Sequence, residues 1–177
     1  IYPKFFTSRK VHKEIVEHLL NNATWAPTHG NTQPWRFKVY MGESRSKLSD
    51  KLGELYKKLT PKELFKDEKF EKIIARPFLS SVSIVICMER GGNEKIPEIE
   101  EVEAVACAVQ NICLTATAYG IGSFWSSPKV IYDNKMNTFL KLKEKDKCLG
   151  ILYLGYPSID WPKGQRKPIE YLTDWNE

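Results

Sequence analysis

Cysteine is scarce in this chain, and the few cysteines follow no redox or metal-binding spacing. Cys87, Cys107, Cys113 and Cys148 include no CxxC pair, and four are too few for a disulfide scaffold in 177 residues. All four have apolar or small neighbours in the sequence. We therefore expect buried free thiols in a reducing compartment, which favours a cytoplasmic protein.

Long apolar runs are absent as well. No stretch is long enough to cross a bilayer, and the first residues lack the pattern of a secretory signal. The chain begins at Ile1 rather than Met, so we expect some residues to precede it. Without a secretory signal, the glycosylation-like triplet Asn22-Ala23-Thr24 is best explained by chance.

Familiar catalytic motifs are also missing. We find no convincing Ser-His-Asp order, no HExxH, no zinc-ligand spacing and no P-loop. The net charge is +5, but the lysines and arginines are mixed with acidic residues rather than clustered. A nucleic-acid binder would need a basic patch interleaved with exposed aromatics. We expect neither a metal nor a nucleic-acid partner.

The hydrophobic content of 42% and the length support one domain, over residues 1–177, with a full core. Hydrophobic periodicity and turn residues predict an α+β fold in which helices flank a mixed sheet. The expected helices cover residues 7–26, 43–59, 61–75, 98–119 and 133–142, and the expected strands cover 36–40, 81–88, a short segment from 124, and 148–157.

The segment from Trp25 to Phe37 carries the most information. Two prolines stiffen its backbone, and a glycine allows another group to approach closely. Between the prolines lie hydrogen-bonding side chains, and tryptophans bracket the segment. Such a loop suits a flat heterocycle with donors and acceptors on its edge. The residues concerned are Trp25, Pro27, Thr28, His29, Gly30, Asn31, Gln33, Pro34 and Trp35.

The string Ala26-Pro27-Thr28-x-x-Asn31-x-Gln33-Pro34-Trp35-x-Phe37 resembles the signature of the nitroreductase family, the FMN-dependent NAD(P)H oxidoreductases. A second segment, from Gln110 to Ser127, resembles another stretch of that family. Its Gly120-x-Gly122 is not a Rossmann loop, because it follows a helix and opens a strand. The resemblance implies non-covalent FMN, with Trp125, Ser126 and Ser127 along the flavin ring.

A third element, Gly164-Gln165-Arg166-Lys167-Pro168, resembles the family's C-terminal phosphate contact. The resemblance implies that Arg166 holds the FMN phosphate; a plain solvated arginine is the alternative. His29 has two readings too, contact with the flavin or its phosphate, or a turn histidine bonded to backbone. The family's basic-x-Ser phosphate triplet would lie upstream of Ile1, and Ser8-Arg9-Lys10 does not replace it.

The implied activity is a ping-pong hydride transfer from NADH or NADPH through FMN to a nitroaromatic, a quinone or a similar electron-poor acceptor. No side chain need act as a nucleophile. The alternative is a regulatory FMN-binding protein without turnover. The family resemblance and the small residues of helix 98–119 predict a homodimer with an exchanged C-terminal extension. The candidate cofactor-binding residues are Trp25, Pro27, Thr28, His29, Asn31, Gln33, Trp125, Ser126, Ser127 and Arg166.

Overall fold

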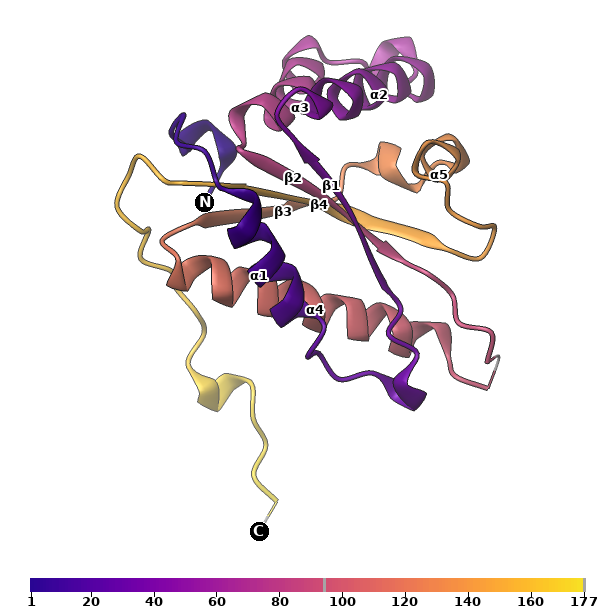
Figure 1. Cartoon of the computed structure of the whole chain (residues 1–177), viewed down its shortest axis with the longest axis vertical. Helices are drawn as coiled ribbons and strands as arrows, with labels where there is room; N and C mark the ends of the chain where they lie inside the picture. Colours follow the sequence, from indigo (N-terminus) through magenta and orange to yellow (C-terminus); the bar gives the residue numbers. More distant parts are fainter. Residues whose placement is uncertain (94, 177) are drawn as a thin grey trace.

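A four-stranded sheet lies between two layers of helices in the computed structural model, which describes residues 1–93 and 95–176 (Figure 1). The strand order is β1-β2-β4-β3, and every pairing is antiparallel. The strands are β1 (Trp35–Met41), β2 (Val82–Met88), β3 (Gly122–Ser126) and β4 (Lys147–Gly155).

The α+β class is confirmed, but parallel pairs are not found among the described strands. β2 and β3 do run in the same direction, as expected for strands joined by a long crossover helix. They are not neighbours, because β4 lies between them and pairs with both. The predicted mixed sheet is therefore wrong for the described part of the chain.

The helices cover both faces of the sheet. α1 (Lys13–Ala23) and α4 (Glu98–Ala118) pack on one face, and α2 (Ser44–Leu59), α3 (Asp67–Leu79) and α5 (Asn134–Leu140) lie on the other (Figure 1). All of β2 is buried. Ile84 and Ile86 join the core under α1 and α4, whereas Val85 and Cys87 join the other core. This explains the continuous apolar run of this strand.

Two helices begin and end at residues that differ from the sequence expectation. The first helix begins at Lys13 because the residues before it are extended, and the Thr7 amide donates to the Tyr156 carbonyl at 2.7 Å. It ends at Ala23. The third helix spans Asp67–Leu79 rather than 61–75, and it accommodates Pro77 in its last turn.

The thiols only partly match the expected burial. The four cysteines are free, and Cys87 and Cys148 are buried in the core. Cys107, in contrast, is exposed on the outer side of α4, and Cys113 is half-buried and packs against the core under α1 and α4. None of the helices in the described ranges is long and apolar enough to cross a membrane.

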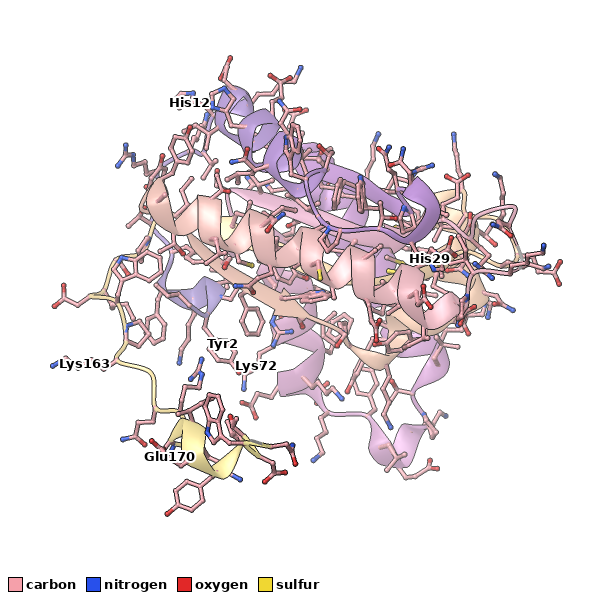
Figure 2. The ribbon with its side chains drawn as sticks, turned by 90° about the horizontal axis from the view of Figure 1, so that it is seen from below. Tyr2, His12, His29, Lys72, Lys163 and Glu170 are labelled. Carbon is pink, nitrogen blue, oxygen red and sulfur yellow. The ribbon has the colours of Figure 1, made fainter. Side chains whose placement is uncertain are left out.

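The segment after β4 leaves the body of the molecule. From about residue 158 the chain runs outward, with one short 3-10 turn at Ile169–Tyr171 (Figures 1 and 2). Its large apolar side chains lie at the surface, and Trp175 is 80% exposed. The other exposed residues of this kind are Ile159, Trp161, Ile169, Tyr171 and Leu172.

Candidate functional site

The loop between α1 and β1 has an unusual backbone. Gly30, Asn31 and Gln33 have φ angles of +56°, +53° and +46°, in the left-handed region. Asn enters that region more readily than most residues, whereas for Gln it is uncommon. Such conformations persist only where the surroundings hold them, and they concentrate at binding sites. The backbone alone therefore marks this loop as a candidate site.

Hydrogen bonds inside the loop hold this conformation. The Thr28 hydroxyl accepts from the Gln33 amide at 3.2 Å and lies 3.1 Å from the Thr32 hydroxyl. The Gln33 side-chain amide donates to Asn31 Oδ1 at 3.0 Å. The side chains of His29, Asn31 and Gln33 remain exposed. The loop therefore exposes polar side chains whose positions are fixed by hydrogen bonds within the loop itself.

His29 pairs with a side chain that the sequence analysis did not suggest, and its contact with a flavin stays a prediction. Its Nδ1 pairs with the Glu100 carboxylate in the first turn of α4. This contact ties the loop to the helix that crosses beneath the sheet, and Figure 2 shows His29 beside the end of that helix. The two partners are 71 positions apart in the sequence, which explains why local sequence patterns did not reveal the pair.

Both ends of the loop are anchored. On the α1 side, Asn111 Nδ2 donates to the Asn22 carbonyl at 3.2 Å, which gives this asparagine of the second family-like segment a structural role. On the β1 side, the Pro34 carbonyl accepts from the Glu89 amide at 2.8 Å. The Glu89 carboxylate also pairs with Arg36 at 2.5 Å. These contacts keep the loop at one end of the sheet.

Lys143 and Arg36 together lower the pKa of Glu89, with the Lys143 hydrogen bond as the larger cause. The carboxylate therefore stays ionised at neutral pH. Arg90, the residue after Glu89, donates to Glu101 at 2.5 Å, and Glu101 is only 1% exposed. A buried charge left without its partner is costly, so this pair holds the following turn against α4.

The two tryptophans do not form a pair of walls. Trp35 is 5% exposed and belongs to the core under α1 and α4, whereas Trp25 is 85% exposed. The expectation of exposed aromatic surface at both ends of the loop is therefore wrong for Trp35, whereas a flavin contact of Trp25 stays a prediction. The core covers Trp35, so of these two tryptophans only Trp25 exposes its ring to a partner or ligand.

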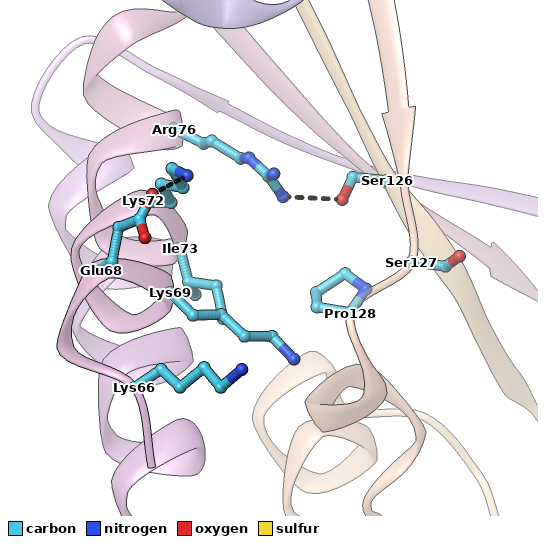
Figure 3. Close-up of a pocket in the computed structure, with 9 residues that line it drawn as sticks. All are labelled: Lys66, Glu68, Lys69, Lys72, Ile73, Arg76, Ser126, Ser127 and Pro128. Carbon is cyan, nitrogen blue, oxygen red and sulfur yellow. Dashed lines mark hydrogen bonds and ion pairs between the residues drawn. The ribbon is translucent and has the colours of Figure 1, made fainter. Parts of the chain in front are cut away.

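The second group of predicted residues lies at the end of β3. The Trp125 indole packs against Gly150 of β4, where an irregular register gives the strand a local bulge. The Ser126 hydroxyl accepts from Arg76 Nη1 at 3.0 Å. Ser126 and Ser127 line a cavity of about 310 Å³ between β3 and α3, drawn in Figure 3.

The structure does not join all predicted residues in one pocket. The loop precedes β1 and the serines end β3, and these strands form opposite edges of the sheet. With strands about 4.8 Å apart, three steps separate the edges by about 14 Å. Arg166 lies in the exposed tail, where its guanidinium donates to the Gln165 carbonyl at 2.8 Å. The candidate site therefore has two separate halves. The loop half is residues 27–33 before β1, and the β3 half is residues 125–127 at the end of β3.

Sequence reasoning missed the basic residues beside Ser126. Lys69, Lys72 and Arg76 recur at intervals of three and four, a spacing that places them on one face of α3. That spacing is visible in the sequence, but a helix rich in lysine and glutamate is also typical of a solvated surface. Only the packing of α3 beside β3 shows which elements this face meets.

Comparison with known proteins agrees with these observations. The sequence model of the Nitroreductase family matches residues 3–156. The "Putative NAD(P)H nitroreductase YdjA" of Escherichia coli (strain K12) is 29% identical over 146 residues, which cover 82% of this chain and 78% of that protein. YfhC of Bacillus subtilis (strain 168), named in the same way, is 26% identical over 93% of this chain and 84% of its own.

Solved structures show the same fold. The nitroreductase-like family protein of Bacillus cereus superposes with a TM-score of 0.83 at 30% identity, covering all of this chain and 91% of that one. The FMN-dependent nitroreductase NfnB of Mycobacterium smegmatis, solved with NADPH, has a TM-score of 0.78 at 16% identity, covering 100% of this chain and 94% of that one. Since the family model covers most of the sequence, this chain belongs to the nitroreductase family.

Proposed function

We propose that this chain is a single FMN-binding domain that acts as an NAD(P)H-dependent oxidoreductase. The observation that carries the proposal is the loop of residues 27–33, whose left-handed backbone displays exposed amides within a family-matched sequence. Names of relatives add support, because YdjA and YfhC are both named as NAD(P)H nitroreductases. The acceptor class we propose is a nitroaromatic, a quinone or another electron-poor ring.

The residues of both halves fit such a cofactor chemically. Asn31 and Gln33 offer amide donors and acceptors, which match the alternating polar atoms on a flavin edge. At the end of β3, Ser126 and Ser127 add hydroxyls beside the flat Trp125 side chain. Arg166 has a planar fork of donors suited to a phosphate, and its exposed position leaves it able to reach one.

Bound FMN would supply the hydride chemistry, taking a hydride from the nicotinamide and passing electrons to the acceptor. The residues of this chain bind and orient. Asn31 and Gln33 hold the edge of the ring, and Trp125, which is 40% exposed, shields one part of it from water. The hydrogen bond to Cys148 and burial raise the pKa of Cys87, so this thiol does not serve as a nucleophile in the hydride transfer.

A homodimer would complete the site. The loop half of one protomer and the β3 half of its partner would enclose one flavin, which resolves the separation of the two halves. The outer side of α4 offers a surface for this contact, because Ile99, Cys107 and Leu114 are exposed there. The aromatic tail would then pack on the partner. The free thiols fit a reducing cytoplasm.

Purification with added FMN tests the proposal. We expect yellow protein with close to one flavin per chain, bleaching by NADH or NADPH, and recovery of colour when a quinone or nitroaromatic is added. Bound flavin that neither nicotinamide reduces would instead favour the regulatory FMN-binding protein. Protein that takes up no flavin would contradict both.

A further inference from the structure

We propose that Cys87 of β2 and Cys148 of β4 form a reversible disulfide when the protein meets a small peroxide. This modification site is separate from the proposed flavin reaction. Both residues are free thiols, and they lie opposite each other on neighbouring strands (Figure 1). The described residues contain no group of three or more His, Cys, Asp and Glu side chains placed to hold a metal ion, so redox chemistry is the use open to this pair.

The bulge in β4 brings the two cysteines to the same face of the sheet. Up to Ile86 the pairing with β4 is regular, and a regular ladder would next place Cys87 opposite Leu149. The register instead shifts by one residue, so that Cys87 lies opposite Cys148. Side chains alternate between the two faces of a strand, and the extra residue of a bulge reverses that alternation beyond it. Leu149 therefore packs on the core under α1 and α4, whereas Cys148 joins Cys87 in the other core.

The two thiols already interact in the reduced protein. Cys87 is 0% exposed and Cys148 is 3% exposed, and their side chains share a hydrogen bond. The hydrogen bond from the Cys87 thiol lowers the pKa of Cys148 although burial opposes it, and a backbone hydrogen bond from Gly150 acts in the same direction as the thiol. Because the thiolate is the reactive form of cysteine, Cys148 is the sulfur that reacts first. Cys87 keeps its proton until the second step.

The oxidation proceeds in two balanced steps. Because the Cys148 side chain is almost completely buried at the start of β4, the oxidant has to be small, and hydrogen peroxide meets that need. The Cys148 thiolate attacks one peroxide oxygen, so that an S–O bond forms, the O–O bond breaks and hydroxide leaves. Cys87 then attacks the Cys148 sulfur, so that the S–S bond forms, the S–O bond breaks and a second hydroxide leaves. The protons of the two thiols convert both hydroxides to water.

The disulfide would join two strands at the centre of the sheet. β2 and β4 are the inner strands of the order β1-β2-β4-β3, and α4, β3 and α5 lie between them in the sequence. A crosslink between residues so distant in the sequence restricts the unfolded chain, and it stabilises the fold when the native geometry accommodates the bond. Here the bulge already places both sulfurs on one face. The oxidised protein should therefore be more stable than the reduced protein, and a dithiol should reverse the difference by exchange.

The test uses the full chain purified with FMN and the double variant Cys107→Ser/Cys113→Ala, which keeps only the proposed pair. Each protein is treated with hydrogen peroxide, its remaining thiols are blocked with N-ethylmaleimide during denaturation, and its peptides are identified by mass spectrometry. We expect peptides joined through Cys87 and Cys148 in both proteins, and their separation by dithiothreitol. Cys87→Ala removes the second thiol, so dimedone should then capture the sulfenic acid of Cys148.

Thermal unfolding supplies a second measurement. Peroxide should raise the unfolding temperature of the double variant, and dithiothreitol should abolish the rise. Cys148→Ala, which lacks one thiol of the pair, is the matched control and should show no such rise. Free Cys87 and Cys148 after peroxide treatment, a link that forms only in urea, or an oxidised protein less stable than the reduced one would overturn the proposal. Flavin content is measured separately, so failure of the proposed function does not affect this test.

Discussion

Asn31 combines a left-handed backbone with an exposed amide, so its side chain and its conformation have to be tested separately. Asn31→Ala removes the amide and also places a less tolerant residue at a φ of +53°. Asn31→Gly removes the amide but keeps the conformation accessible. If the side chain binds the flavin ring, both variants should weaken FMN by about 1–3 kcal/mol, as for a lost hydrogen-bond partner.

Flavin fluorescence quenching gives the FMN dissociation constant for each variant. A loss seen only with Ala would assign the effect to backbone strain. Unchanged FMN affinity and turnover in both variants would falsify a direct role for Asn31.

Arg166 lies in the exposed tail with only a local hydrogen bond to Gln165. If it holds the FMN phosphate, Arg166→Ala should weaken FMN far more than riboflavin, which lacks the phosphate. Lys163→Ala, which removes another exposed cation of the same tail, should affect both ligands little. Titration with the two flavins checks this, and equal weakening of FMN and riboflavin by Arg166→Ala would remove the phosphate assignment.

Among the elements, β4 contains a bulge whose geometry positions Trp125. Gly150 has a φ of +146°, and a Cβ there would lie 2.8 Å from Trp125 Cδ1. Gly150→Ala should therefore displace the indole, lower the thermal stability and weaken FMN. Gly42→Ala is the control, because Gly42 also has a positive φ, +55°, but a Cβ there would meet nothing within 4 Å.

For Gly42→Ala we expect only the cost of the backbone conformation, about 1–2 kcal/mol. Denaturation curves, tryptophan fluorescence and the FMN dissociation constant separate the two variants. If Gly150→Ala leaves the fluorescence and FMN affinity of the wild type unchanged, Trp125 is not positioned in this way.

For the whole molecule, the separation of the two half-sites predicts a dimer. Leu114, on the outer side of α4, is 61% exposed, and Leu64, in the turn before α3, is 63% exposed. A charge at a buried interface is costly, so Leu114→Arg should yield monomers that lose FMN. Leu64→Arg should leave the assembly unchanged.

Light scattering of the purified protein measures the mass. We expect twice the mass of one chain for the wild type and for Leu64→Arg. A wild-type mass of one chain at micromolar concentration, with flavin bound, would rule out the dimer together with the shared site.

Local sequence patterns determined most of the elements of this protein. The apolar, β-branched run of β2 indicated a strand buried on both faces, and the small apolar residues of α4 indicated its packing. The prolines, Gly30 and Asn31 located the loop, because their backbone preferences are local properties. The family resemblance came from the same residues and is confirmed by the match over residues 3–156.

Tertiary structure decided what depends on residues distant in the sequence. The Thr7 amide donates to the Tyr156 carbonyl, so the first helix begins later in the sequence than local spacing predicts. Strand β4 lies between β2 and β3 and pairs antiparallel with both. His29 pairs with Glu100 across a long sequence separation. Arg76 donates to Ser126 because α3 lies beside the end of β3. Periodicity shows which face of an element is apolar or charged, but not which other element that face will meet. The division of the candidate site into two halves follows from strand order, which no local pattern encodes.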